Sequence, residues 1–411
     1  MKTQGFKSVL HSSAYTRKEQ LVTTNGCFPT LIQSGASGTH TRLENHLYVM
    51  SPNVACTNLR VLYASFRSRE GEDSSLSVSQ CQLQASLVYN NQFCPVSFNG
   101  TTTTTFDPAV TILRSNPVGV YIPANTEIKV KTGAVITAGT SVAACISRSY
   151  KNVKLSSTNG LSAIFNTSDV SSGTATTLGL FPLAIVGTPA KPTFSILGWG
   201  DSRTAGSGDN TANTSGGIGY FERACFNVDG NGRAIPFSNL SKSGDVATTY
   251  DVDEAFSRYA TFPYAQCVLL SLGINDISSG RTFDQIKASF EEAILHANIH
   301  NLIILVGTIA PCTTSTDSWV TVANQTVVAG YADQGLRGQV NRYLWNLYTS
   351  KEVHGIVDVD SVCRDPDQID LWKPNYTADG LHFNEVCTIA IAEAFKPLLR
   401  TLSDEFNSMV S

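Results

Sequence analysis

The stretch GWGDSRTAGSGD, residues 198–209, directly follows the apolar run Thr193–Leu197. The apolar run predicts a buried strand, and the glycines after it predict a sharp turn where that strand ends. A turn of this kind can carry a nucleophilic serine, bind a phosphate through its backbone N–H groups, or simply reverse the chain. The pattern of the residues that follow separates these three interpretations.

Downstream of this turn, apolar runs alternate with helical patterns. The apolar runs are Thr193–Leu197, Ala234–Leu240, Gln266–Leu272, Leu302–Ile309 and Gly355–Val359. The helical patterns are Ile218–Phe226, Tyr250–Ala260, Phe283–His300, Gly338–Ser350 and Glu385–Thr401. This alternation predicts an α/β domain over residues 192–411, with a mostly parallel five-stranded sheet covered by helices on both faces.

Polar residues follow the ends of several of these apolar runs. Asp201 and Ser202 come after the first run, Gly244 after the second and Asn275 after the third. The segment Asp379–His382 lies beyond the fifth run and directly before the last helical pattern. Because ligands of a parallel sheet bind at the carboxyl ends of its strands, we expect these residues to share one edge.

These residue types meet the chemical demands of ester hydrolysis. A serine needs a base to become nucleophilic, and that base is most often a histidine held by a carboxylate. Asp379 and His382 are three residues apart, so on one tight turn the aspartate can orient the imidazole. We predict Ser202, His382 and Asp379 as a catalytic triad. The N–H groups of Ser202 and Gly244, with the amide of Asn275, are predicted to form the oxyanion hole.

The four blocks, taken in order, resemble the SGNH (GDSL-type) hydrolase family. They read Gly200–Ser202, a block centred on Gly244, Gly273–Asp276 and Asp379–His382. The resemblance covers roughly residues 193 to 400. It implies a flavodoxin-like three-layer α/β/α fold and a serine hydrolase that needs neither a metal nor an organic cofactor.

The other interpretations of the glycine-rich turn fail in detail. A phosphate-binding P-loop needs a lysine, and no lysine lies between Gly198 and Gly219. A dinucleotide-binding fingerprint breaks at Arg203, where its last glycine should stand. The nucleophile elbow of α/β-hydrolases breaks at Thr204 for the same reason.

Arg203 departs from the family pattern, which usually has an apolar residue after the nucleophile. One interpretation is a structural arginine paired with a nearby carboxylate. The other is a substrate-binding residue for a polar or anionic group, which would disfavour a long acyl chain.

Three tryptophans in the second half are either packing residues or faces on which a sugar ring can stack. They are Trp199, Trp319 and Trp372. Trp319 lies in the loop-like segment Thr313–Leu336, which follows the fourth apolar run at the expected active edge. We therefore predict Trp319 as a substrate-contacting residue.

The other histidines of the second half are weaker candidates for chemistry. His296 and His300 have the spacing of a helical metal pair, but Ala297 stands where a zinc protease has its glutamate. His354 lies before the fifth run, and Lys351 stands where His382 has its aspartate. We predict no metal site.

The first half of the chain follows a different pattern, with short alternating segments separated by turn residues. This pattern predicts an antiparallel β-sandwich over residues 1–150. The stretch Ser115–Lys131 resembles a jelly-roll module that precedes SGNH domains in some carbohydrate esterases and phage tail proteins. Residues 151–191 are rich in Ser, Thr and Gly without a period, so we predict a long connection between the two domains.

Composition limits the classes of partner. The chain has 411 residues, enough for two or three domains of roughly 150 residues. A net charge of -4 gives no electrostatic reason for binding nucleic acid or an anionic membrane. No apolar run is long enough for a signal peptide or a membrane span, so we expect a soluble protein. The sequence does not decide whether the protein is located in a phage particle, in the cytoplasm or outside the cell. It also does not decide whether the protein forms a homo-oligomer.

The ten cysteines include no Cys-x-x-Cys pair and no cluster with zinc spacing. We expect most of them to be buried thiols, with Cys81 and Cys94 as the pair to be bridged in an oxidising environment.

These observations predict a serine esterase that removes a short acyl group, acetyl above all, from a carbohydrate or another small ester. Two alternatives remain open at this point. One is a glycan-binding or structural virion protein that has a hydrolase-like fold, and the other is a sugar acyltransferase that uses the same residues.

Overall fold

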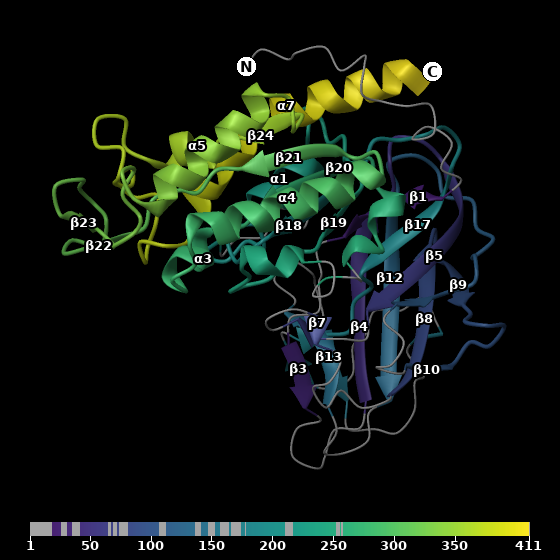
Figure 1. Ribbon diagram of the computed structural model, residues 1–411. Coiled ribbons are helices and arrows are strands. Elements are labelled where there is room, and N and C mark those ends of the chain that lie inside the picture. Colours follow the sequence, from purple (N-terminus) through teal and green to yellow (C-terminus); the bar gives the residue numbers. More distant parts are fainter. Residues whose placement is uncertain are drawn as a thin grey trace. The chain divides into compact units, whose positions relative to one another are not determined.

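The computed structural model describes residues 19–25, 31–34, 42–64, 67–68, 72–73, 81–106, 112–135, 141–146, 153–156, 164–165, 174–176, 178–209, 217–251, 255 and 258–410 (Figure 1). These residues form two compact units. The α/β unit contains the described residues of Ile196–Gly232 and Asn239–Ser411. The β unit contains those of Lys18–Ser195 and Arg233–Ser238.

One six-stranded sheet of the described chain, in the order β2-β19-β18-β20-β21-β24, contains β2 (Thr24–Asn25) and the five strands of the predicted parallel sheet. They are β18 (Ile196–Gly200), β19 (Phe237–Asn239), β20 (Cys267–Ser271), β21 (Ile303–Gly307) and β24 (Gly355–Val357). The pairs β18–β20, β20–β21 and β21–β24 are parallel. All residues of β18 and β21 are buried, because helices cover both faces of the sheet, and this burial explains their continuous apolar runs.

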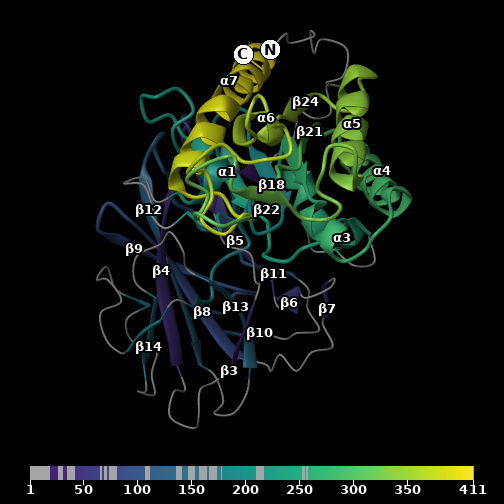
Figure 2. The same cartoon turned by 90° about the vertical axis from the view of Figure 1, so that its left-hand side faces the viewer.

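The helices lie in two groups, one on each face of the sheet (Figure 2). On one face α1 (Gly219–Phe226) and α6 (Val359–Cys363) pack against α7 (Glu385–Val410). On the other face α4 (Phe283–Ile299) packs against α5 (Leu336–Thr349). The short helix α3 (Ile274–Ser278) follows β20. The three-layer α/β/α prediction is therefore confirmed.

The capping box of α4 explains why that helix begins where it does. The hydroxyl of Thr282 accepts the N–H of Gln285, and the Gln285 side chain accepts the N–H of Thr282. The predicted helix over residues 250–260 lies partly outside the described residues. The 3₁₀ helix η3 (Ala247–Tyr250) ends where the predicted helix begins, the described residues Ala255, Arg258 and Tyr259 are helical, and η4 (Phe262–Tyr264) follows.

The β unit consists of antiparallel sheets, apart from β2 (Thr24–Asn25), which pairs in parallel with Phe237 and Ser238. Within the described residues, one sheet has the order β1-β17-β5-β11: Gln20–Leu21, Ala184–Pro189, Cys56–Ala64 and Ile112–Arg114. A larger sheet has the order β10-β8-β12-β4-β14-β15, with β9 also on β8: Thr104–Phe106, Cys81–Tyr89, Glu127–Val135, Arg42–Met50, Val153–Ser156, Thr174–Thr176 and Gln92–Val96. The remaining strands are β16 (Leu178–Gly179), β13 (Ser141–Ile146) and β3 (Leu31–Ser34) in one sheet, and β6 (Arg67–Ser68) with β7 (Glu72–Asp73).

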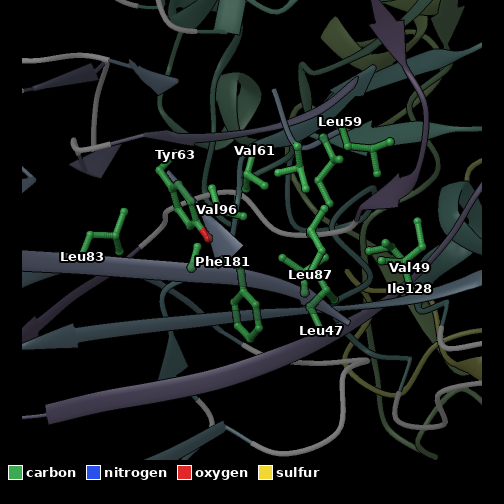
Figure 3. Packing of buried hydrophobic residues seen from close by; sticks show 14 of the residues in the cluster. Leu47, Val49, Leu59, Val61, Tyr63, Leu83, Leu87, Val96, Ile128 and Phe181 are labelled. Carbon is green, nitrogen blue, oxygen red and sulfur yellow. The ribbon is translucent and has the colours of Figure 1, made fainter. Parts of the chain in front are cut away.

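One hydrophobic core lies between the two larger sheets (Figure 3). Leu59, Val61 and Tyr63 alternate along β5, and Leu83 and Leu87 alternate along β8, so each strand turns one face inward. The antiparallel sandwich is thus the architecture of this unit. The likeness to a jelly roll stays a prediction.

The structure corrects the predicted connection over residues 151–191. Its described parts contain β14, β15, β16 and β17, and they belong to the β unit. β17 lies between β1 and β5, and its residues Ala184, Ile185 and Val186 are buried. β14, β15 and β16 are only two to four residues long, and β17 belongs to the apolar run Leu180–Val186, which Pro182 interrupts, so the sequence pattern did not mark these strands.

The predicted pair Cys81–Cys94 is not bridged, and both residues are thiols. The register of β8 and β9 places Cys94 opposite Leu87. Six residues of strand separate Leu87 from Cys81, on the order of 20 Å, which is far too long for a disulfide.

None of the helices in the described part of the chain combines the length and the hydropathy that crossing a bilayer requires.

Candidate active site

The glycine-rich turn places Ser202 at the carboxyl end of β18. Ser202 follows Gly200 and Asp201, and only 6% of its surface is exposed. A Cβ at Gly200 would lie 2.3 Å from the hydroxyl oxygen of Thr204. A Cβ at Gly208, where φ is +91°, would lie 2.5 Å from the carbonyl oxygen of Phe383. Both positions therefore require glycine, because the turn packs closely against Thr204 and against the backbone of Phe383.

His382 lies in the loop before α7, and its ring connects Ser202 to Asp379. Nε2 of His382 is 3.0 Å from Oγ of Ser202, and Nδ1 is 2.7 Å from Oδ2 of Asp379. The carboxylate accepts the Nδ1–H, which leaves Nε2 to accept the serine hydroxyl proton. This arrangement brings the three predicted triad residues together in a hydrogen-bonded relay.

Asp379 is held in its charged form by its neighbours. Burial raises the pKa of its carboxyl group, but hydrogen bonds from the ring and backbone of His382 and from the N–H of Leu381 outweigh burial, and the pKa is lowered. The two backbone bonds to Oδ1 measure 2.7 and 2.9 Å. The carboxylate is therefore ionised at neutral pH and can stabilise an imidazolium.

The loop that carries Gly244 lies between the nucleophile turn and Asn275. The N–H of Lys242 donates to the carbonyl of Gly200 at 3.0 Å, and Nδ2 of Asn275 donates to the carbonyl of Asp245 at 2.8 Å. Gly244 has a φ of +80° and is exposed. An asparagine amide has two N–H donors, so Asn275 keeps one for a ligand. The predicted oxyanion donors thus come from neighbouring loops.

Buried carboxylates bind backbone and side-chain groups of these loops. Both oxygens of Asp276 accept the N–H of Ala247, at 2.9 and 2.8 Å, and burial raises the pKa of Asp276 to about 6. Asp245 forms a buried ion pair with Arg258 at 2.7 Å. Oδ1 of Asp201 accepts the N–H of Arg203, and burial raises the pKa of Asp201 to about 7. These acids use their oxygens to bind backbone N–H groups and an arginine of the loops, which gives them a structural role.

Arg203 is buried, with 5% of its surface exposed. Its guanidinium donates to the carbonyl oxygens of Leu381, Ala310 and Pro311, at 2.8, 3.2 and 2.9 Å. The expected structural arginine thus has backbone carbonyls as its hydrogen-bond partners in place of a carboxylate. Contact with a substrate stays a prediction.

Trp319 lies in a hairpin that the sequence did not reveal, formed by β22 (Thr313–Ser315) and β23 (Gln325–Val327). Its Nε1–H donates to the hydroxyl of Thr313 at 2.9 Å. Its ring lies against Gly380, where an added Cβ would be 2.6 Å from Cζ2 of the tryptophan. Trp319 is therefore half-buried beside the residue that follows Asp379, and its contact with a substrate stays a prediction.

The other two candidate tryptophans, Trp199 and Trp372, are fully buried. Trp199 packs against Tyr250 and Tyr259, and Nε1–H of Trp372 donates to the carbonyl of Gly380 at 3.1 Å. Both are packing residues.

A carboxylate that sequence reasoning missed organises the hairpin. The side chain of Asp317 accepts hydrogen bonds from Thr321, Asn324 and Ser315, and these bonds hold its pKa well below the usual range. The signal was present as a Ser-x-Asp sequence at a turn, which is typical of side chains that bond to the nearby backbone.

The remaining histidines have structural surroundings. Nδ1 of His354 accepts the N–H of Ile304 at 3.0 Å, and burial lowers the pKa of His354 to about 4. The ring of His296 packs on Tyr259, and that of His300 on Phe262. Within the ranges that the structure describes, no three His, Cys, Asp or Glu residues are grouped so as to hold a metal ion.

The unit has the three-layer α/β/α fold, and its candidate site lies at the carboxyl edge of the sheet. Residues 199–386 match the model of the GDSL-like Lipase/Acylhydrolase family. This part of the chain is therefore a GDSL-like, or SGNH, hydrolase domain, and hydrolases of this kind act on esters.

Solved structures with related folds are distant in sequence. A member of the lipolytic G-D-S-L family from Veillonella parvula is 19% identical, with a TM-score of 0.37 over 50% of this chain and 98% of that one. A mutant acetyl-xylooligosaccharide esterase from Geobacillus Stearmophilus is 15% identical, with a TM-score of 0.35 over 49% and 92%. A Bacillus subtilis protein is 12% identical, with a TM-score of 0.38 over 93% and 88%. No curated protein matches the chain. With TM-scores this low, the assignment rests on the family match and the site geometry.

Proposed function

We propose that the protein is a serine esterase that removes a short acyl group, acetyl above all, from a carbohydrate. The observation that carries the proposal is the hydrogen-bonded relay from Ser202 through His382 to Asp379. A relay of this kind makes a hydroxyl nucleophilic near neutral pH.

The geometry supports a two-step reaction. Oγ of Ser202 attacks the ester carbonyl while its proton passes to Nε2 of His382, and Asp379 stabilises the imidazolium. The N–H groups of Ser202 and Gly244 and the second amide proton of Asn275 bind the oxyanion. When the intermediate collapses, the ester C–O bond breaks and the leaving alcohol takes the proton from His382. Water then attacks the acyl-serine through the same relay, which releases the acid and restores the hydroxyl of Ser202.

The rim of the site supports a polar alcohol. The hydroxyl oxygens of Ser207 and Ser243 lie 3.3 Å apart, and Ser243 is exposed. Hydroxyl groups of this kind can exchange hydrogen bonds with the hydroxyls of a sugar. The resemblance of Ser115–Lys131 to modules of carbohydrate esterases favours the same class of substrate.

The first experiment compares Ser202→Ala with Ser207→Ala. We expect Ser202→Ala to lose hydrolysis of p-nitrophenyl acetate by on the order of 10⁶ in kcat, because the nucleophile is gone. The control removes a rim hydroxyl from the same turn and keeps the relay, so we expect it to retain most of the kcat. Equal rates in wild type and Ser202→Ala would exclude the esterase mechanism.

Three further measurements test the substrate and the two alternative functions. Acetate release from a panel of acetylated polysaccharides, beside esters of increasing acyl length, identifies the alcohol and the acyl group. Stoichiometric labelling of Ser202 by an organophosphonate distinguishes an enzyme from a glycan-binding or virion protein, which would bind sugar and remain unlabelled. Acyl transfer to an added sugar, in excess of hydrolysis, would identify an acyltransferase.

A further inference from the structure

Arg203 connects the two parts of the chain that carry the serine and the histidine. Ser202 and His382 are 180 residues apart in sequence, yet their reacting atoms lie 3.0 Å apart. Arg203 follows the serine directly, and Nε of its guanidinium donates to the carbonyl of Leu381, which directly precedes the histidine. A single side chain therefore links the neighbour of the nucleophile to the neighbour of the base.

The other donors of this guanidinium extend the link to a third segment. Nη1 and Nη2 donate to the carbonyls of Ala310 and Pro311, which follow β21. The nucleophile turn, the segment after β21 and the histidine loop thus share one planar group. A guanidinium presents its donors in a rigid fork, which a lysine ammonium does not reproduce.

Aromatic rings enclose the same guanidinium. Its centre lies 5.2 Å from the ring of Phe383 and 5.6 Å from the ring of Trp372. Phe383 directly follows the histidine, and Trp372 donates to the carbonyl of Gly380. Leu381 and Phe383, the residues on either side of His382, therefore both contact Arg203, and Gly380 is bonded to its ring partner Trp372.

The histidine loop also packs closely against the glycine-rich turn. A Cβ at Gly208 would lie 2.9 Å from Cβ of His382 and 2.5 Å from the carbonyl oxygen of Phe383. The loop is thus held both by this close packing and by Arg203. Burying a charged group is costly unless hydrogen bonds satisfy it, and here the satisfied charge is placed between the two catalytic segments.

We propose that Arg203 is a positioning residue, which holds the backbone of the His382 loop so that Nε2 stays within hydrogen-bond distance of Ser202. The proposal rests on the proposed esterase function for its effect on rate. It assigns Arg203 a role that an apolar residue at this position cannot perform, since an apolar side chain cannot bind the carbonyl of Leu381.

The test compares Arg203→Lys and Arg203→Met with wild type, using p-nitrophenyl acetate. A displacement of about 1 Å at a catalytic group costs on the order of 100-fold in rate, so we expect kcat to fall by about that factor in Arg203→Met and less in Arg203→Lys. The KM should stay within about twofold, because the guanidinium donates to backbone carbonyls and has no assigned contact with the ester.

The matched control is Arg337→Lys. Arg337 is also fully buried and donates to the carbonyls of Tyr331 and Ile369 and to the carboxylates of Asp360 and Asp370. We expect this variant to have a lower Tm and an unchanged kcat. Phe383→Leu, which removes a ring beside the guanidinium and leaves Arg203 in place, should lower kcat in the same direction even if Arg203→Met does not fold.

A second readout does not depend on ester hydrolysis. The Nδ1–H proton between His382 and Asp379 should give a far-downfield proton NMR signal in wild type and in Arg337→Lys, and it should broaden or vanish in the Arg203 variants. If wild type gives this signal but does not hydrolyse esters, the proposed function is overturned. Loss of the signal in the Arg203 variants would then still support the positioning role, and an unchanged signal would overturn it. A raised KM with unchanged kcat, or a lowered Tm with kcat and signal unchanged, would overturn the positioning role.

Discussion

Two histidines of the α/β unit, His382 and His354, differ in exposure and in hydrogen-bond partners. His382 lies at the carboxyl edge of the sheet, with 25% of its side chain exposed and its ring between a carboxylate and a hydroxyl. His354 lies directly before β24, is largely buried, and uses Nδ1 to accept a backbone N–H from β21. Burial lowers the pKa of His354 to about 4, so that ring is neutral at pH 7.

The difference shows that the environment of the ring defines its role. The carboxyl ends of parallel strands leave loops free to bring polar groups together, whereas the amino end of β24 is hydrogen-bonded to its neighbour strand. A carboxylate partner makes His382 able to carry a proton in mid-reaction, whereas Nδ1 of His354 accepts the backbone N–H of Ile304, which gives that ring a structural role.

The largest expected effect separates the two rings directly. Replacing the base, His382→Ala, should lower kcat for p-nitrophenyl acetate by on the order of 10⁶, because the nucleophile loses its proton acceptor. His354→Asn, which keeps an acceptor for the N–H of Ile304, should retain the wild-type kcat at neutral pH. Comparable losses in both variants would contradict the assignment of His382 as the base.

The partner of the catalytic ring gives the next effect. Asp379→Asn should lower kcat by on the order of 10⁴, since the amide cannot stabilise an imidazolium and favours the wrong tautomer. Far-UV circular dichroism should match wild type. A kcat within tenfold of wild type would show that His382 does not depend on this carboxylate.

The oxyanion donors give a smaller effect at the same edge. Asn275→Ala should lower kcat by about 10²–10³ with a nearly unchanged KM, because the donor acts on charge that develops only in the transition state. Ser278→Ala, which removes an exposed hydroxyl from the same short helix α3, is the control and should retain its rate. A change confined to KM would point to ground-state binding in its place.

The smallest effect concerns the contribution of His354 to the stability of the fold. The folded-state pKa of His354 lies below its unfolded value, so the unfolded chain binds more protons between roughly pH 6.5 and 4. The stability linked to this ring is complete above pH 6.5 and is lost as the pH falls toward 4. At pH 5 the loss should be about 2 kcal/mol, at roughly 1.4 kcal/mol for each pH unit.

Urea unfolding of wild type and His354→Asn at pH 5 and pH 7 measures this difference. Asparagine does not titrate, so the variant should lose less stability than wild type between the two pH values. Equal losses would show that His354 is no more protonated in the unfolded chain than in the folded one.

The sequence by itself determined the elements that depend on local pattern. Continuous apolar runs marked β18, β20 and β21, because strands buried on both faces leave no polar alternation. Residue types and spacing marked the triad, since Asp379 and His382 are close in sequence and Ser202 lies at the end of a strand. The strands β14, β15 and β16 escaped this reasoning because they have only two to four residues, and β17 escaped it because Pro182 interrupts its apolar run.

Only the tertiary structure decided what Arg203 binds. From the sequence, this side chain had two explanations, a carboxylate partner or a substrate. Its observed partners lie 107 to 178 residues away and are backbone carbonyls, which every residue possesses. No spacing of residue types can mark a carbonyl, because that group has no side-chain identity. The same reason hid the contact of Trp319 with Gly380, which depends on how two loops meet in space.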